Sequence, residues 1–529
     1  MVLSVDSDVL ILGSGGAGLR AAIETNARRM KTIIASKAPA GMNNCTVVAG
    51  GGFRAAMEGM TPDEHMRDTI DVGKGLNDRR LVEIFTSEGT ARILELRDYG
   101  VEVRVHSTGA SVGNIPNLMG LGMTKPMVEY VHSKGVLFMD NVAVTKLLKM
   151  GDRVVGAVGY DVKNEEPITF TTRAVILATG GAGALYKRTD CPIRTTGDGY
   201  SLGLHAGARL RDMEFVQFFP LALAEPGQPP YLLGGPMTEE GKIINSLGED
   251  IPQKYHITAR PLVLKSRDLL SRALMTEITQ GGGVDGAVLI DAREVFRKHT
   301  VKQIADEGTQ RILVEKLRAA EKPFRVAPVC HFCMGGLVID EQGYTGVPGL
   351  YAAGEVVGGI HGANRHGGNA LTEILVFGAR AGAAAAKQAS KGKKEKIADL
   401  AKQETQRYES IMAREYRYDP HDLIERLREV MWAKAGIIRD SSSLAEAFET
   451  VFDLKLLADR VSARNGRDIL VALEAQMALE SAEMIIRAAM ERKESRGAHY
   501  RTDYSNEDPR WLKPIYISLS GTEALKFTV

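Results

Sequence analysis

The sequence predicts an α/β fold built around a parallel sheet, and two observations lead to this prediction. The apolar run Val9-Leu10-Ile11-Leu12 passes directly into a glycine-rich turn and then into a stretch with helical spacing, as in a buried strand that leads into a helix. Two later apolar runs, residues 174–179 and 349–355, also lead into glycine-rich loops. Ligands bind at the carboxyl ends of the strands in such sheets. The pattern therefore predicts a Rossmann-like domain that holds a dinucleotide.

The first glycine turn has the spacing that a dinucleotide site requires. Gly13 permits the tight turn, Gly15 lets backbone amides approach a pyrophosphate, and Gly18 lets the helix pack closely on the strand. The helix N-terminus attracts the anion. An ordinary glycine-rich turn is the alternative interpretation, but the strand before the pattern and the helix after it favour the dinucleotide site.

Length, composition and charge limit the remaining possibilities. A chain of 529 residues should contain several domains of about 150 residues each. The net charge of +1 argues against nucleic acid or a membrane surface as a general partner, and no apolar run approaches the roughly 20 residues that cross a bilayer. The first strand begins by Val9, which leaves no room for a signal peptide, and four cysteines provide no disulfide framework. We therefore expect a cytoplasmic protein, with partner subunits as its link to the inner face of a membrane.

The other segments have distinct patterns. Residues 31–37 form a β-branched run, expected to lie parallel to the first strand, and this run ends in Ser36-Lys37 rather than in the acid that usually holds the ribose of NAD. Residues 62–134 look largely helical, and residues 136–179 contain short strands. A buried helix is expected up to residue 386. After a lysine-rich linker, helical spacing recurs at residues 397–415, 422–438, 442–465 and 468–490, and the tail ends in a β-like segment.

Several motifs occur in a fixed order along the chain. They are Thr196-Gly197-Asp198-Gly199, Asp212 to Gln217, Ser266-Arg267-Asp268, His331 to Gly336, His361 to Arg365 and Arg496 to Arg501. In this order they resemble the FAD-binding flavoproteins of the fumarate reductase, succinate dehydrogenase and L-aspartate oxidase family. The resemblance implies an FAD-binding domain at residues 1–220 and 328–390, an inserted α+β capping domain at 221–327, a helical domain at 397–510 and a tail at 511–529.

The resemblance also implies which residues bind FAD. The family's covalent histidine is absent here, because Asn44-Cys45-Thr46 occupies that stretch. A thioether to Cys45 is one alternative, but we expect a small buried cysteine and non-covalent FAD. No metal site is expected. The implied FAD contacts are Gly13, Gly15, Gly16, Ser36, Lys37, Thr46, Gly51, Gly181, Asp198, Glu355, Asn369 and Leu371.

Three residues match the family's catalytic positions. The resemblance implies that Arg365 and His331 hold a substrate carboxylate and that Arg267 is the proton donor, with a relay through Asp268 as a hypothesis. An arginine suits a carboxylate because it can donate two parallel hydrogen bonds. The alternatives are an Arg267–Asp268 ion pair, a core His331 and a phosphate-facing Arg365.

Three further stretches depart from the family pattern or have no assigned role in it. Phe219 and Leu221 stand where the family motif has a histidine and a threonine, and the histidine would bind the second carboxylate. Thr238-Glu239 has altered spacing. An apolar ring cannot compensate the desolvation of a carboxylate. Cys330 and Cys333 bracket His331; we interpret them as wall residues of the site rather than as a redox pair or metal ligands.

Taken together, these features predict an enzyme. We expect the FAD-bearing subunit of a fumarate reductase or succinate dehydrogenase-like complex, which interconverts a saturated and an α,β-unsaturated carboxylate by hydride transfer at flavin N5. Its partners would be a small carboxylic acid and an iron–sulfur subunit, since the chain lacks cysteine clusters. The alternatives are a dehydrogenase or enoate reductase for an acyl-thioester or aromatic acid, and a non-catalytic electron-transfer subunit. L-aspartate oxidase is less favoured because of Phe219.

Overall fold

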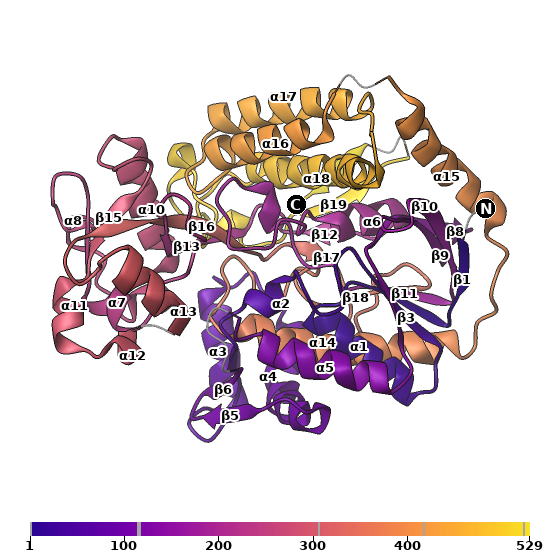
Figure 1. Cartoon of the computed structure of the whole chain (residues 1–529), viewed down its shortest axis with the longest axis horizontal. Coiled ribbons are helices and arrows are strands. Elements are labelled where there is room, and N and C mark those ends of the chain that lie inside the picture. Colours follow the sequence, from indigo (N-terminus) through magenta and orange to yellow (C-terminus); the bar gives the residue numbers. More distant parts are fainter. Residues whose placement is uncertain (1–2, 114–117, 305–306, 416–417, 522–523) are drawn as a thin grey trace.

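The central feature of the computed structural model is a five-stranded parallel sheet (Figure 1). The structure describes residues 3–113, 118–304, 307–415, 418–521 and 524–529. The strand order is β18-β11-β2-β3-β7, with every neighbouring pair parallel, which confirms the predicted sheet. The strands are β2 (Val9–Leu12), β3 (Thr32–Ser36), β7 (Leu137–Asp140), β11 (Ala174–Leu177) and β18 (Leu350–Ala352).

Two long helices follow the glycine loops at the ends of these strands. Helix α1 (Gly16–Ala27) follows β2, and helix α14 (Asn369–Ala389) packs against it. A second sheet, of order β1-β10-β9-β8, contacts the central sheet through β9 and β8. Its strands are β1 (Leu3–Asp6), β8 (Val142–Met150), β9 (Arg153–Asp161) and β10 (Glu166–Thr171).

The region between residues 62 and 134 is less helical than we expected. A hairpin of β5 (Val103–His106) and β6 (Gly109–Val112) pairs with β4 (Gly52–Arg54). A Cβ on Gly109 would overlap the carbonyl oxygen of Phe53, so this glycine lets the two strands approach closely. The helices are α2 (Cys45–Val48), α3 (Pro62–Val72), α4 (Arg79–Leu94), η1 (Glu95–Tyr99) and α5 (Leu121–Ser133).

The capping domain lies to one side of the FAD-binding domain, at the left of Figure 1, and has its own hydrophobic core. Its antiparallel sheet has the order β13-β16-β15-β14, and β13 and β16 connect it to the FAD-binding domain. The strands are β13 (Val216–Leu223), β14 (Lys242–Ile244), β15 (Val288–Asp291) and β16 (Phe324–Cys333). The helices are α7 (Pro236–Glu240), α8 (Ile251–Lys254), α9 (Leu262–Lys265), α10 (Arg267–Thr279), α11 (Arg293–Lys298), α12 (Val301–Ile304), α13 (Glu307–Gln310) and η3 (Arg311–Lys316).

The four predicted C-terminal helices are confirmed. Side chains cap the starts of the last two: Asp440 accepts a hydrogen bond from the backbone N–H of Ser443, and Asn465 accepts from those of Arg467 and Asp468. The helices are α15 (Ala398–Ala413), α16 (Pro420–Lys434), α17 (Ser441–Ala458) and α18 (Gly466–Glu491). In the described part of the chain, no helix has both the length and the apolar character needed to span a membrane.

The tail completes a small sheet beside α18. Strands β19 (Tyr516–Leu519) and β20 (Leu525–Thr528) join β12 (Leu210–Arg211) and β17 (Gly336–Leu337), in the order β17-β12-β19-β20. The β-like end of the tail is thus confirmed. The remaining short elements are η2 (Gly183–Leu185), α6 (Asp198–Ala206), η4 (Thr502–Tyr504) and η5 (Pro509–Trp511).

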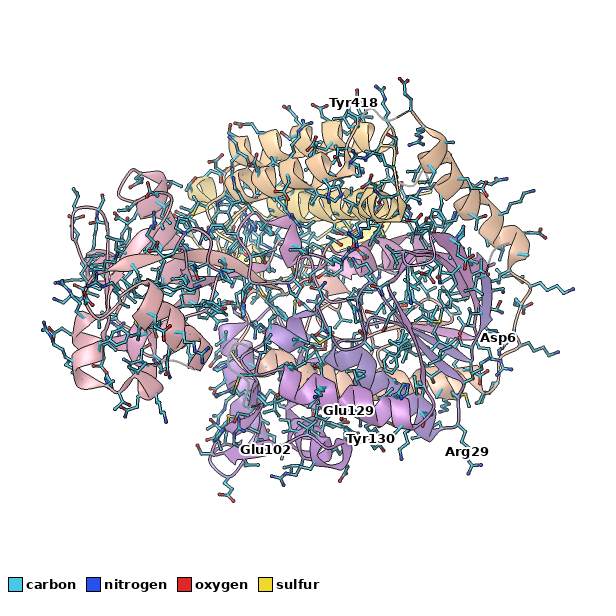
Figure 2. All side chains as sticks on the ribbon, viewed as in Figure 1. Asp6, Arg29, Glu102, Glu129, Tyr130 and Tyr418 are labelled. Carbon is cyan, nitrogen blue, oxygen red and sulfur yellow. The ribbon has the colours of Figure 1, made fainter. Side chains whose placement is uncertain are left out.

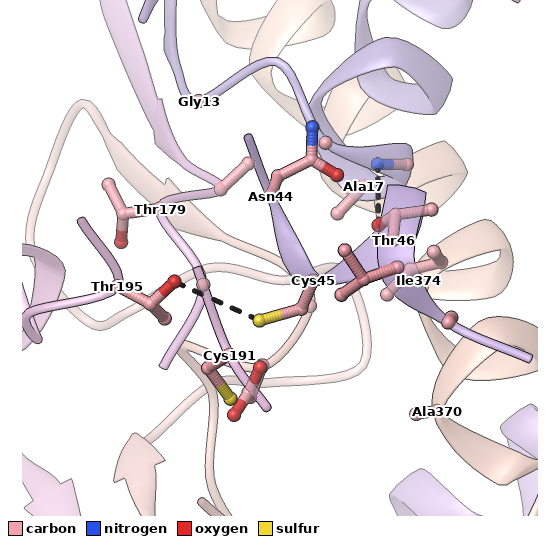
Figure 3. A pocket seen from close by; sticks show the side chains of 18 of the residues that line it. Gly13, Ala17, Asn44, Cys45, Thr46, Thr179, Cys191, Thr195, Ala370 and Ile374 are labelled. Atoms are coloured by element: carbon pink, nitrogen blue, oxygen red, sulfur yellow. Dashed lines mark hydrogen bonds between the residues drawn. The ribbon is translucent and has the colours of Figure 1, made fainter. Parts of the chain in front are cut away.

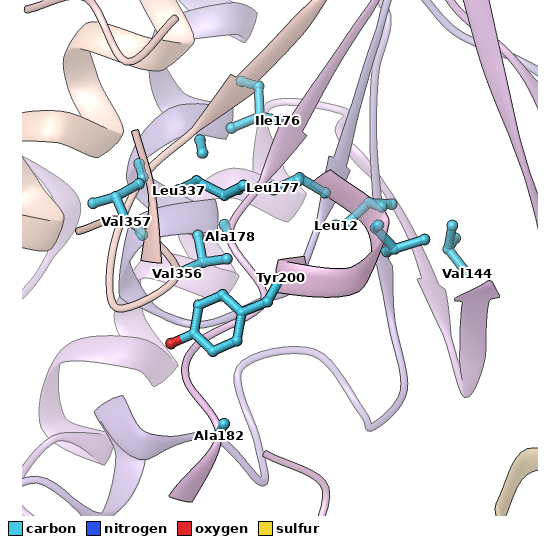
Figure 4. Packing of buried hydrophobic residues seen from close by; sticks show 14 of the residues in the cluster. Leu12, Val144, Ile176, Leu177, Ala178, Ala182, Tyr200, Leu337, Val356 and Val357 are labelled. Atoms are coloured by element: carbon cyan, nitrogen blue, oxygen red, sulfur yellow. The ribbon is translucent and has the colours of Figure 1, made fainter. Parts of the chain in front are cut away.

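Apolar side chains from several segments meet below the nucleotide loops. Leu12 and Leu177 from neighbouring strands lie near Tyr200 of α6 and Val356, and all four are buried (Figure 4). Charged side chains such as Asp6 and Arg29 extend from the exterior (Figure 2). The nucleotide loops therefore lie against buried apolar residues.

Candidate functional site

A cavity of about 450 Å³ opens where the central sheet meets the capping domain. The turn after β2, the loop 42–52, residues 178–180 and the start of α14 line most of it. Figure 3 shows Gly13, Asn44, Thr46 and Thr179 around this space. The cavity therefore lies at the carboxyl ends of the strands, as the sequence predicted.

The glycines of the first turn have the geometry that close packing requires. Gly13 has a φ of 109°, and a Cβ there would overlap the carbonyl oxygen of Ala178. A Cβ on Gly18 would overlap the carbonyl oxygen of Gly13, so only glycine lets α1 approach β2 this closely. Gly15 and Gly16 line the cavity, and the N–H of Gly16 donates to Thr46 Oγ1 at 3.1 Å.

A buried ion-pair cluster lies beside the end of β3. Lys37 Nζ is 2.6 Å from Asp198 Oδ2 and 2.8 Å from Glu474 Oε1. Burial alone would lower the pKa of Lys37, but these two carboxylates raise it. Ser36 accepts a hydrogen bond from Ser14 at 3.0 Å. Ser36, Lys37 and Asp198 all line the cavity.

Glu355 also lines the cavity, but backbone groups hold its carboxylate. Glu355 Oε1 accepts from the N–H of Cys333 at 3.0 Å, and the backbone of Gly181 donates to the same side chain. Burial raises the pKa of Glu355 to about 7. Gly181 itself does not line the cavity; a Cβ there would overlap the Glu355 carboxylate, so this glycine positions Glu355.

The side chain of one predicted FAD contact, Asn369, points away from the cavity. Asn369 is fully buried at the start of α14, where its Oδ1 is 2.9 Å from His65 Nε2 and its Nδ2 donates to Thr69 at 2.9 Å. These partners direct the amide away from the cavity, which Asn369 does not line. The prediction for Asn369 came from the family resemblance, which gives no side-chain direction. Gly51 and Leu371 do line the cavity.

The residues present fit FAD. The N-terminal turns of α1 and α14 follow Gly15 and Gly368, neither of which provides a side-chain cap, so backbone N–H groups are available for the cofactor's polar groups. A Cβ on Gly50 or Gly52 would meet no atom within 4 Å, which leaves open space along the cavity wall. Thr179 Oγ1 is buried without a hydrogen-bond partner in the described residues.

Two arginines share one acceptor at the capping-domain end of the cavity. Arg267 Nη1 donates to Gln217 Oε1 at 2.9 Å, and Arg365 Nη2 donates to the same oxygen at 3.1 Å. The amide of Gln217 is fixed in turn, since its Nε2 donates to Asn364 Oδ1 at 2.6 Å. Gln217 comes from β13 and Arg267 begins α10, so the capping domain and the FAD-binding domain meet at this amide.

Both guanidinium groups are buried, and both line the cavity. Burial, together with the charge of Arg365, lowers the pKa of Arg267 to about 9, and burial lowers the pKa of Arg365 to about 10. Arg365 Nε has no partner in the described residues. Aromatic rings support both groups: the Arg267 Cζ lies 5.1 Å from the ring centre of Phe219, and the Arg365 Cζ lies 4.3 Å from that of Phe332.

His331 lies in the same wall and is held by a residue that the sequence analysis missed. Its Nδ1 is 2.7 Å from Asp190 Oδ2, and both residues line the cavity. Burial lowers the pKa of His331, while Asp190 opposes this shift. Asp190 follows no motif that could have identified it, because the two residues meet only in the folded chain.

The interpretation of Arg267 and Asp268 as an ion pair is wrong. Asp268 Oδ2 is 3.6 Å from Arg272 Nη2, one helical turn further along α10. In a helix, residues i and i+4 share a face whereas adjacent residues do not. The proposed relay from Arg267 through Asp268 therefore lacks a contact in the described structure.

The segments that depart from the family pattern lie behind the cavity rather than on it. Phe219 packs in the capping domain, with its ring centre 5.6 Å from that of His331. Glu239 Oε1 accepts from the N–H of Leu262 at 2.8 Å, and Thr238 donates to the carbonyl of Gly235 at 3.1 Å. Neither Thr238 nor Glu239 lines the cavity.

All four cysteines lie near this site, and all are free thiols. Cys45 and Cys191 line the cavity, and their sulfur atoms face the same space in Figure 3. Cys330 and Cys333 are buried in β16, where burial raises the pKa of both thiols. In the described ranges, no group of three or more histidine, cysteine or acidic side chains is arranged to hold a metal.

Comparison with known proteins places this geometry in a family. The FAD binding domain model matches residues 8–371, and the fumarate reductase flavoprotein C-terminal model matches residues 424–527. The chain belongs to the fumarate reductase flavoprotein family. Its fold is therefore that of an FAD-binding domain with an inserted capping domain and a C-terminal helical domain.

The relatives cover nearly the whole chain. A fumarate reductase (CoM/CoB) subunit from Methanothermobacter marburgensis is 36% identical over 97% of both chains. An L-aspartate oxidase of Caulobacter vibrioides is 32% identical, covering 97% of this chain and 96% of its own. The structure of E. coli quinol fumarate reductase aligns with a TM-score of 0.90 at 26% identity, over 100% of this chain and 97% of that one. The protein is an FAD-dependent oxidoreductase of the type that acts on CH–CH bonds.

Proposed function

We propose that this flavoprotein interconverts an α,β-unsaturated carboxylate and its saturated form. The pair of guanidinium groups on Gln217 Oε1 carries the proposal, because two buried cations face the cavity with a neutral amide as their shared acceptor. Buried cations of this kind are stabilised by an anion. A substrate carboxylate would supply that charge.

Different residues bind the substrate and transfer the proton. Arg365 and His331 bind one carboxylate, with the unpartnered Nε of Arg365 as an available donor. Arg365 also stabilises the negative charge that develops on this carboxylate as the double bond is reduced. Bound FAD supplies a hydride to one carbon of the double bond.

Arg267 donates the proton to the other carbon. An ordinary guanidinium is too weak an acid for this role, but burial and the charge of Arg365 lower the pKa of Arg267 to about 9. The aromatic ring of Phe219 and the carbonyl of Val263, which accepts from Arg267 Nε at 3.1 Å, hold the group in place. A lowered pKa in a fixed orientation favours proton transfer.

Electrons reach the flavin from a different polypeptide in this proposal. The chain has four cysteines, and they lie at or beside the cavity rather than in a cluster-binding motif. Several relatives are named as subunits, among them the fumarate reductase flavoprotein subunit of Mycobacterium tuberculosis, 31% identical over 96% of this chain and 93% of its own. We propose that the partner is an iron–sulfur subunit, which would also provide the link to the cytoplasmic face of a membrane.

Anaerobic reoxidation tests this function. Dithionite-reduced protein is mixed with fumarate or with a longer 2-enoate, and the flavin absorbance is followed. We expect rapid reoxidation by at least one enoate. Arg267→Ala should keep its FAD and reoxidise about 100-fold or more slowly, since general acids contribute 10²- to 10⁴-fold. Arg297→Ala, on the exposed surface of the capping domain, serves as the control. The absence of reoxidation by every enoate, or an unchanged rate in Arg267→Ala, would contradict the proposal.

A further inference from the structure

The capping domain contributes three side chains to the cavity wall in its described residues, 221–304 and 307–327. They are Leu232, Leu264 and Arg267. Arg267 belongs to the cationic end already described. The rest of this wall is therefore apolar.

Both leucines are only partly buried. Leu232 keeps 36% of its surface exposed and Leu264 keeps 51%, although both line a cavity. Leu232 is fixed beside β13 by a bridge to Ala222, and a Cβ on Gly367 would lie 3.1 Å from Leu264 Cδ2. Leucines held in such positions offer apolar surface to whatever fills the cavity.

Polar side chains of the capping domain that could face a second anion are engaged elsewhere. Glu239 accepts from the N–H of Leu262 and so fixes the start of α9, the helix that carries Leu264. Thr238 donates to Gly235. The ring of Phe219 lies behind Arg267 and His331 and carries no hydrogen-bond donor. A second carboxylate beside Leu232 and Leu264 would lose its hydration without gaining a donor from the capping domain.

We propose that the substrate carries a single carboxylate and an apolar chain, as in a 2-enoate with an alkyl or aryl substituent. The carboxylate binds Arg365 and His331, and the apolar chain covers Leu232 and Leu264. This inference rests on the proposed function, because it assumes that the cationic end binds the carboxylate of a reacting acid.

The test compares saturated acids as ligands of the oxidised holoprotein, by isothermal titration calorimetry and by the perturbation of the flavin spectrum. We expect the dissociation constant to fall about fourfold for each methylene from butyrate to hexanoate, the factor that corresponds to ~0.8 kcal/mol per buried methylene. Succinate should bind more weakly than butyrate, because its second carboxylate meets the leucines.

A charge placed on the apolar wall should reverse this preference. Leu264→Lys should bind succinate at least tenfold more tightly than wild type and hexanoate more weakly. Leu247→Lys is the matched control, since Leu247 is 79% exposed and does not line the cavity. Both substitutions replace an exposed leucine, so folding should be retained, and the bound FAD reports it.

The outcomes separate the two proposals. Tighter binding of succinate than of butyrate and hexanoate in wild type, or an unchanged preference in Leu264→Lys, overturns the single-carboxylate inference and leaves the proposed function standing. If no carboxylate binds the FAD-loaded protein, both proposals fail. Reoxidation of the reduced protein by fumarate but not by 2-hexenoate overturns only the inference.

Discussion

Arg267 and Arg365 donate to the same oxygen, Oε1 of Gln217, from two different domains. The charge of Arg365 adds to the effect of burial in lowering the pKa of Arg267. The contact brings like charges together in a buried wall. The nearby carboxylates of Asp190 and Glu355 offset the cost of this arrangement only in part, since the pKa values of both arginines stay lowered.

Arg365→Met should stabilise the substrate-free protein while it removes activity. The substitution replaces a buried cation by an apolar chain that can still pack on Phe332, so we expect the free energy of unfolding to rise by ~1–2 kcal/mol. Turnover should fall about 100-fold or more, as when one donor to a developing anion is lost. Thermal unfolding of the FAD-loaded protein and enoate reduction measure the two effects. A lower melting temperature with bound FAD retained would show that Arg365 has a mainly structural role.

The pH dependence should report the proton on Arg267. The group carries this proton below its pKa of about 9 and loses it above, so kcat should decline as the pH rises through 9. Arg267→Lys should move the decline to lower pH, because the reference pKa of lysine is about 2 units below that of arginine. The pH–rate profile of reduced-flavin reoxidation is the measurement.

Arg297→Lys, on the exposed surface of the capping domain, should leave this profile unchanged. A rate that stays constant to about pH 10, or a decline that does not move in Arg267→Lys, would argue against Arg267 as the proton donor.

Asp190 should act as a positioning residue for His331. Its carboxylate opposes the lowering of the His331 pKa by burial, so Asp190→Asn should lower this pKa further. Fewer molecules would then carry the imidazolium that binds the carboxylate at a given pH. We expect KM to rise about tenfold with kcat less affected. The increase of KM with pH, which follows the loss of the imidazolium proton, should move to lower pH. Asp291→Asn, in β15 of the capping-domain sheet, is the control, and a rise of KM that moves to higher pH would refute this role.

FAD should be released when the protein is denatured. Cys45 lies in the stretch where the family resemblance implied a covalent histidine, but its thiol lies 3.9 Å from Thr195 Oγ1 among small cavity residues. After acid precipitation we expect the flavin absorbance in the supernatant, with the same result for Cys45→Ser. Flavin that stays with the wild-type chain but is released from Cys45→Ser would demonstrate a thioether.

The sequence by itself determined the nucleotide-binding frame and the order of the domains. The strand, glycine turn and helix at residues 9–27 and the four C-terminal helices depend on local spacing and on backbone freedom at Gly13 and Gly18. The hairpin at β5 and β6 escaped prediction because Gly109 acquires its role only when Phe53 lies beside it. Local patterns carry information only about neighbours along the chain.

Only the tertiary structure decided which side chains meet in the cavity. Asp190 and His331 are 141 residues apart, and Gln217 is 148 residues from Arg365, yet each pair forms one contact. Asn369 turns towards His65, and Asp268 pairs with Arg272 rather than with Arg267. These outcomes depend on side-chain direction and on packing between distant segments, because a buried polar group takes the partner that the fold brings within reach.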